Sequence, residues 1–98
     1  MDTESKRIQH ALDVVRDRHP ERIKSTTHKL DEDSAGEPAV WVWVVLDDSE
    51  AADRSFTATS NRFREEIKEA LRDEGVTRWP YVRFRTYSEQ KELEKNDA

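Results

Sequence analysis

The sequence predicts a small α+β domain, a two-layer sandwich of order α-β-β-α-β with a three-stranded mixed sheet and two helices on one face. Three observations indicate this class. Apolar residues recur at helical spacing in residues 4–18 and 57–74, and alternating or continuous apolar runs typical of strands fill residues 22–30, 40–46 and 77–87. A chain of 98 residues has room for one core, so residues 1–98 are expected to form a single domain with polar ends that can fray.

The first helix is predicted over Glu4–Arg18. Its apolar stripe follows the i, i+3, i+4, i+7 pattern with Ile8, Ala11, Leu12 and Val15. Thr3 or Asp2 can cap its start, because a short polar side chain accepts hydrogen bonds from the first free amides. Pro20 ends the helix, since proline cannot continue the hydrogen-bond ladder.

Two strands follow and are expected to form a hairpin. Arg22–Leu30 alternates and is mostly polar, which is typical of an edge strand. Asp31–Pro38 collects charge, Gly and Pro and predicts the hairpin loop. Val40–Leu46 is apolar at every position and should therefore be the central strand.

The second helix is predicted at Thr57–Glu74, after a polar connection from Asp47 to Ser55 that has room for a helical turn of its own. Gly75 suits the position after the helix end, where a left-handed backbone is common. Apolar residues mark the buried side, and mixed charges are expected on the solvent side, where the members are Arg64, Glu65, Lys68, Glu69 and Arg72.

The third strand is predicted over Thr77–Tyr87. A helix between the second and third strands makes a crossover connection, so these strands should be parallel and adjacent. Beyond it, Ser88 is a candidate N-cap for a short C-terminal helix, with a frayed tail as the alternative.

The alternation of side chains assigns the two faces of the sheet. The valines are expected to face the helices in a core that also contains Leu46, Val82, Phe84, Ile8, Leu12, Val15, Phe63, Ile67 and Leu71. The opposite face would then carry the residues that we expect to form a binding site, which are Trp41, Trp43, Tyr81, Arg83 and Arg85. Large aromatics left open in this way mark an interaction surface. The alternatives are that the tail or the Asp47–Ser55 connection covers them, or that the core lies on the tryptophan side.

Composition restricts the partners of this face. Trp, Tyr and Arg are enriched both in protein interfaces and in platforms that stack single-stranded bases. The net charge of −5 disfavours nucleic acid, so the expected partner is another protein or a second copy in a homodimer. No run of residues is long and apolar enough for a membrane span, and the absence of cysteine suits a reducing cytoplasm.

No motif in the sequence indicates a reaction, a cofactor or a metal. His10, Asp13 and Asp17, and likewise Asp47, Asp48 and Glu50, lack the spacing of known metal sites and are interpreted as solvated groups. His28 could approach Asp31 or Glu37, but no serine stands in a nucleophile motif. Enzymatic activity, for example in a pocket beside the Asp47–Ser55 connection, is therefore the minor alternative.

The order of elements resembles that of KH and ferredoxin-like domains, but only in topology. A KH domain holds its nucleotides with a GxxG loop, and Gly36 and Gly75 are the only glycines of the chain. The sequence therefore assigns the protein to no family.

Overall fold

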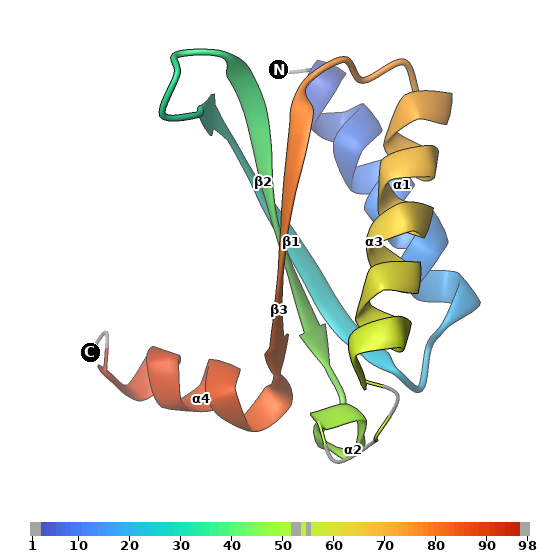
Figure 1. The fold of residues 1–98 in the computed structure, drawn as a ribbon, viewed down its shortest axis with the longest axis vertical. Helices are drawn as coiled ribbons and strands as arrows, with labels where there is room; N and C mark the ends of the chain where they lie inside the picture. Colours follow the sequence, from blue (N-terminus) through green and yellow to red (C-terminus); the bar gives the residue numbers. More distant parts are fainter. Residues whose placement is uncertain (1–2, 52–53, 55, 97–98) are drawn as a thin grey trace.

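The computed structural model describes residues 3–51, 54 and 56–96 and confirms the α+β class (Figure 1). The elements are α1 (Thr3–Arg18), β1 (Ile23–Glu32), β2 (Pro38–Leu46), α2 (Asp48–Ala51), α3 (Phe56–Asp73), β3 (Trp79–Thr86) and α4 (Tyr87–Asn96). The two long helices begin and end within one residue of the predicted bounds. Of the two predicted caps of α1, Thr3 is the first helical residue and Asp2 lies outside the described residues.

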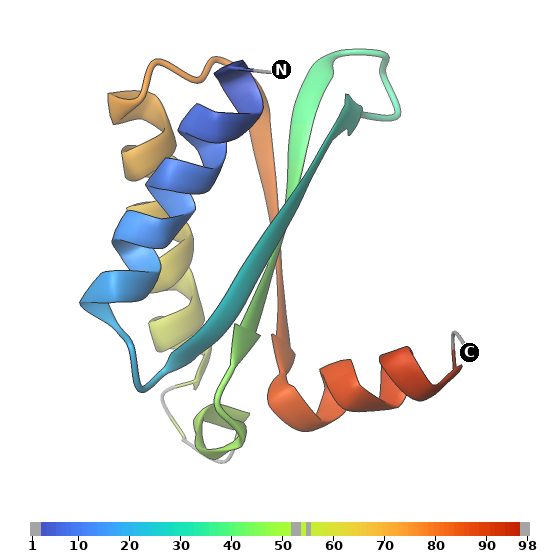
Figure 2. The same ribbon diagram turned by 180° about the vertical axis from the view of Figure 1, so that it is seen from behind.

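The three strands form one mixed sheet in the order β1-β2-β3 (Figure 2). β1 runs antiparallel to β2, and β2 runs parallel to β3, as the crossover through α3 requires. β2 is the central strand, which explains why it is apolar on both faces. β1 and β3 are the two edges of the sheet.

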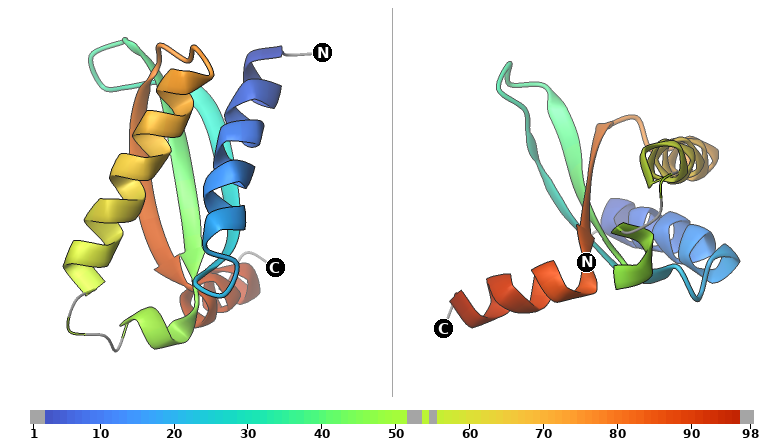
Figure 3. Two further views of the ribbon diagram at one scale, coloured as in Figure 1. Left: turned by 90° about the vertical axis from the view of Figure 1, so that its right-hand side faces the viewer. Right: turned by 60° about the horizontal axis from the view of Figure 1, so that its bottom comes forward.

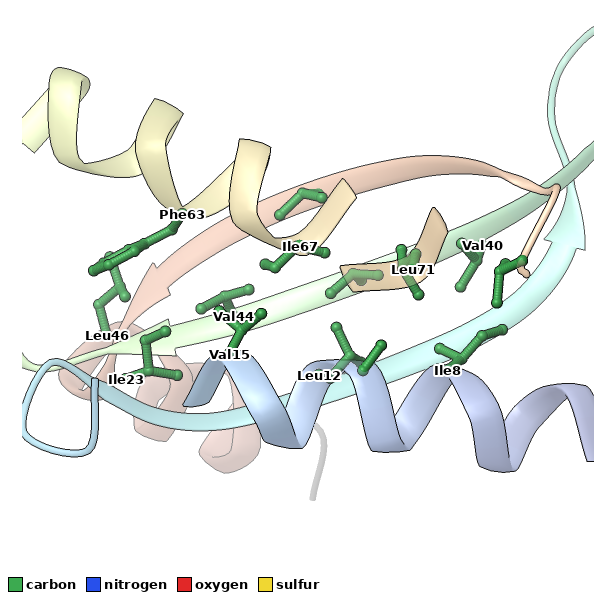
Figure 4. Packing of buried hydrophobic residues seen from close by; sticks show 14 residues of the cluster. Ile8, Leu12, Val15, Ile23, Val40, Val44, Leu46, Phe63, Ile67 and Leu71 are labelled. Atoms are coloured by element: carbon green, nitrogen blue, oxygen red, sulfur yellow. The ribbon is translucent and has the colours of Figure 1, made fainter. Parts of the chain in front are cut away.

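Both long helices cover the same face of the sheet, with α1 over β1 and α3 over β3 (Figure 3). Between them and the sheet lies the predicted valine core, seen closely in Figure 4. Ile8, Leu12, Phe63 and Val42 are fully buried there, while Phe84 packs partly buried against the cluster. Each large aliphatic or aromatic side chain buried in this way contributes about 1.5–3 kcal/mol. The alternative of a core on the tryptophan side is therefore wrong.

The C-terminal end of α3 has the predicted glycine cap. Gly75 adopts φ 76°, and the N–H of Val76 donates to the carbonyl of Leu71 over 3.0 Å. This hydrogen bond satisfies a carbonyl that the helix itself leaves free. Gly36, in the hairpin loop, also has a positive φ, of 78°, and donates its N–H to the carbonyl of Asp33.

The C-terminal helix begins earlier than predicted, at Tyr87, so this residue belongs to α4 and not to the third strand. Thr86, and not Ser88, occupies the N-cap position. The Thr86 hydroxyl accepts the N–H of Glu89 over 3.3 Å, and the Glu89 carboxylate accepts from the Thr86 hydroxyl and N–H. This reciprocal pair is a capping box, which lets a strand turn into a helix without a linker.

The connection after β2 contains the short helix α2, as anticipated, although residues 52, 53 and 55 lie outside the described part of the chain. Within the described residues, no helix is long and apolar enough to cross a membrane.

Candidate functional site

The sheet face turned away from α1 and α3 carries the five predicted site residues. We call it the open face and define it by the side chains of Thr27, Lys29, Trp41, Trp43, Val45, Tyr81, Arg83 and Arg85. The parallel register sets Trp41 beside Tyr81, Trp43 beside Arg83 and Val45 beside Arg85. The structure thus brings together all five residues that the alternation assigned to one face.

The aromatic centre of the open face is a stack across two parallel strands. The rings of Trp41 and Tyr81 lie with their centroids 4.5 Å apart and their planes inclined by 18°. The guanidinium of Arg83 lies 6.0 Å from the centroid of the Trp41 ring, at the outer limit of a cation–π contact. Trp41 and Trp43 are consequently half-buried by neighbours on their own face, while Arg83 stays exposed.

The hairpin loop is tied to this centre. The Tyr81 hydroxyl donates to Asp33 Oδ2 over 3.1 Å. Desolvation is the largest cause that raises the pKa of Tyr81, and the Asp33 carboxylate raises it further. The pKa of Asp33 is lowered, first by the N–H of Glu37 and then by the N–H of Ala35 and the Tyr81 hydroxyl. The contact therefore favours an ionised Asp33 beside a protonated Tyr81.

α4 borders the other end of the open face. It projects from the end of β3 on the side of the sheet opposite to α1 and α3, and the hairpin loop leans to the same side (Figure 1, Figure 3). The Arg85 guanidinium donates to Gln90 Oε1 over 3.2 Å and links the face to α4. Tyr87 is 47% exposed and Leu93 is 41% exposed, so α4 does not bury its own large apolar side chains. α4 lies against β2 and β3, Val45 is buried, and Trp41 and Trp43 keep only part of their surface exposed. Full exposure of the tryptophans, and cover by the Asp47–Ser55 connection, stay predictions.

The open face combines aromatic rings with cationic side chains. Its polar groups are mainly cationic donors, with threonine and the tyrosine hydroxyl beside them, and the Tyr81 hydroxyl donates to the Asp33 carboxylate. Within residues 3–51, 54 and 56–96, no cluster of three or more His, Asp or Glu side chains could hold a metal ion.

An arrangement that pairs a hydroxyl with a histidine lies on the opposite face, between α1 and β1. Ser5 Oγ lies 2.7 Å from His28 Nε2, and Gln9 Oε1 lies 3.2 Å from His28 Nδ1. The Gln9 amide nitrogen donates to Asp13 over 2.9 Å, which turns the amide oxygen toward the imidazole. The structure thus places His28 against α1, and not where the sequence suggested, beside Asp31 or Glu37. Helix and strand positions 23 residues apart meet here, so no linear motif could have revealed the contact.

Two shallow hollows lie elsewhere, along the line where α3 borders β3. Their volumes are about 360 and 340 Å³, and no residue of the Asp47–Ala51 segment lines either of them. The pocket anticipated beside the Asp47–Ser55 connection is not one of these hollows.

The chain matches no known protein family, no characterised protein and no solved structure.

Proposed function

We propose that this protein is a small non-catalytic interaction module that self-associates through its open face. The observation that carries the proposal is an aromatic sheet face on the side opposite to both long helices. A face of this composition, with Trp, Tyr and Arg at its centre, is typical of interface hot spots. A partner that removes the remaining water from the two indoles would be stabilised in proportion to the apolar area that it covers.

A second copy is the partner that the charges of the region favour. A two-fold interface places the same patch on both molecules, so it must carry groups of both signs. The open face provides cations in Lys29, Arg83 and Arg85, and its border provides carboxylates in Asp33 and in the glutamates of α4. α4 stands out beside the face with Leu93 exposed, where it can reach the sheet of a partner related by two-fold symmetry.

Light scattering over a dilution series, read together with the tryptophan emission maximum, tests the proposal. We expect a dimer that dissociates on dilution with a red shift of the emission. Trp43→Ala should move the monomer–dimer midpoint to higher concentration by about tenfold or more, the scale of a hot-spot residue. Glu69→Ala is the control, because Glu69 lies exposed on α3, on the other side of the sheet, and the variant keeps all tryptophans.

Circular dichroism of each variant separates lost association from lost folding. If Trp43→Ala unfolds, Lys29→Glu provides the second variant, since the exposed Lys29 lies beside Trp41. A protein that is monomeric at every concentration would overturn self-association. A monomer whose emission responds to oligothymidine at low salt would instead favour a single-stranded nucleic-acid binder that uses the same face.

A further inference from the structure

The border between α3 and β3 forms a second surface, which shares Arg83 with the open face. Three strands about 4.8 Å apart make a narrow sheet, whereas two helices side by side are each about 10 Å wide. α3 therefore lies over the free edge of β3 (Figure 3). The two hollows are lined by residues of α3 and β3 and of the segment that joins them. We call this border the edge groove and define it by the residues that line the hollows, which are Phe56, Thr57, Ser60, Asn61, Arg64, Glu65, Lys68, Leu71, Arg72, Val76, Arg78, Trp79, Pro80, Val82, Arg83 and Phe84.

The edge groove carries more cations than carboxylates in a chain of net charge −5, with Arg78 paired to Glu4 and Lys68 to Glu65. Its lining includes five Arg or Lys residues and one carboxylate, that of Glu65. Three of the cations, Arg64, Lys68 and Arg72, follow one another at every fourth position of α3 and thus form a single row along the helix. The sequence predicts a mixed-charge solvent face from Arg64, Glu65, Lys68, Glu69 and Arg72. Glu65, Glu69 and Arg72 are exposed as expected, whereas Arg64 and Lys68 are half-buried beside the sheet edge.

Two of these cations are held by aromatic rings of β3. The guanidinium of Arg64 lies 5.2 Å from the ring centroid of Phe84, and Nζ of Lys68 lies 5.9 Å from that of Trp79. Asn61 Oδ1 accepts from Arg64 over 2.8 Å. The two rings and the Asn61 amide hold Arg64 and Lys68 in place before any ligand arrives. These side chains would therefore lose less conformational entropy when a ligand binds. Trp79 is the most exposed of the large hydrophobic residues described, at 59%.

The floor of the edge groove is an unpaired strand edge. Among the described strands, β3 pairs only with β2, so the backbone groups along its other edge face the groove. An edge of this kind is a template for an added strand. Pro80 lacks an N–H and limits such pairing to the part of β3 that follows it.

The spacing of the cations matches an added strand. Residues four apart on a helix are separated by about 6 Å along its axis. Alternate residues of a strand, which point to the same side, are separated by about 6.6–6.8 Å. An extended segment with a carboxylate at every second position would therefore follow the cation row. It could pair with β3 beyond Pro80, where Arg64 lies at Phe84, and would continue past Pro80 without pairing to reach Lys68, at Trp79, and Arg72.

We propose that the edge groove binds an extended acidic segment of another protein, which adds as a fourth strand beside β3 with its carboxylates on the α3 cation row. A second copy fits this surface poorly, because edge-to-edge pairing of two β3 strands would bring two cation rows to one interface. A nucleic acid fits less well, since Arg64 and Lys68 occupy the rings of Phe84 and Trp79 on which bases would stack.

Fluorescence anisotropy with a labelled peptide of alternating glutamate and threonine tests the proposal. We expect binding at low salt that weakens as salt is added. The double variant Arg64→Glu/Lys68→Glu should weaken it about tenfold or more, because two attractions become repulsions. Arg62→Glu is the matched control, since it makes the same charge change on an exposed position of α3 outside the groove. If the double variant fails to fold, Arg64→Gln/Lys68→Gln removes the charges more gently, and it should also weaken binding.

Two further measurements distinguish a strand from a mere polyanion. Hydrogen exchange should show slower exchange of β3 amides when the peptide is bound. A peptide of the same composition with its glutamates in one block should bind more weakly. Unchanged β3 exchange, equal affinity for the block peptide, equal loss in Arg62→Glu, or tighter binding of oligothymidine at the same residues would each overturn the proposal. None of these results depends on whether the open face self-associates.

Discussion

Trp41 and Tyr81 stack across neighbouring parallel strands with their ring centroids 4.5 Å apart, and the hydroxyl of Tyr81 reaches on to Asp33 in the hairpin loop. One side chain thus joins the centre of the sheet to the tip of the hairpin, two parts of the chain 48 residues apart. The stack and the hydrogen bond are chemically separable, which allows each to be tested by itself.

Tyr81→Phe keeps the ring and removes the hydroxyl, whereas Tyr81→Ala removes both. We expect the phenylalanine variant to retain most of the stability of the protein in urea unfolding and the alanine variant to lose clearly more, because stacked area outweighs one partly solvated hydrogen bond. Tyr87→Phe is the control, as this ring lies exposed on α4. Equal losses in the two Tyr81 variants would contradict the assignment of the stack as the main contact.

The environment of the Tyr81 hydroxyl predicts how the protein responds to alkaline pH. Burial and the Asp33 carboxylate raise the pKa of Tyr81 above its ordinary value near 10. A group whose pKa is raised by folding stabilises the fold below its unfolded pKa, and this contribution is lost as the pH rises through the folded pKa. Tyrosinate absorbance should therefore show Tyr81 titrating above pH 10, at a higher pH than in the urea-unfolded chain, and Asp33→Asn should lower that titration.

Asp48 predicts an acid response at the opposite end of the molecule. Its two carboxylate oxygens accept from the hydroxyl and the N–H of Ser88, over 2.6 and 2.9 Å, at the start of α4. These bonds, with the hydroxyl as the largest cause, lower the pKa of Asp48. The stability that ionised Asp48 gives to the fold is fully present above the pKa of this group in the unfolded chain, near 3.9. It is lost as the pH falls through the lower pKa that Asp48 has in the folded protein.

We therefore expect α4 amide signals in NMR spectra to shift on acidification below about pH 4, before the core unfolds. Asp48→Asn should show the change in α4 already at neutral pH. Asp17→Asn, at an exposed position of α1, provides the control. An acid transition that is the same in wild type and in Asp48→Asn would mean that another carboxylate holds α4.

Part of this arrangement could be predicted from the sequence alone. The alternation of β2 and β3 suffices to place Trp41, Tyr81 and Arg83 on one face, since a strand has only two faces and the valines identify the buried one. Gly75 was predictable for a similar local reason, because few residues tolerate the left-handed conformation that ends a helix.

The features that the sequence could not predict depend on how the helices and strands pack against one another. Arg64 and Lys68 belong to the solvent face of α3 if the helix is considered alone. They line a groove only because the sheet is too narrow for two helices, a relation that the pattern of one helix does not contain. The Thr86–Glu89 capping box is present in the sequence as T-x-x-E. It does not stand out as a helix start, because Thr86 is also the last residue of β3 and no linker separates the strand from α4.

The core predicts the largest effect on stability. Ile67, 1% exposed, points from α3 into the valine layer (Figure 4). Ile67→Ala should lower the free energy of unfolding by about 2–5 kcal/mol, from lost transfer energy and the cavity that remains. Glu69→Ala, on the exposed side of the same helix, should change it by less than about 0.5 kcal/mol in the same urea titration. Similar effects for both would contradict the placement of α3.

The contact between Ser5 and His28 is the last feature that variants can resolve. Asp13 orients the Gln9 amide, the amide oxygen accepts from His28 Nδ1, and Nε2 is thereby left to accept the Ser5 hydroxyl. The same geometry activates a serine nucleophile in hydrolases, but there a pocket and donors for an oxyanion stand beside it. Neither of the two hollows described includes Ser5.

We expect the contact between Ser5 and His28 to have a structural role, in which it stabilises the packing of α1 against β1. Ser5→Ala should cost about 0.5–1.5 kcal/mol of unfolding free energy, the net value of one hydrogen bond, and a fluorophosphonate probe should leave Ser5 unlabelled in the wild type. Ser34→Ala, which removes an exposed hydroxyl from the hairpin loop, is the control for both measurements. Labelling of Ser5 that disappears in His28→Gln would instead make the contact a reactive site, because only an activated hydroxyl is phosphonylated and only the imidazole could activate it here.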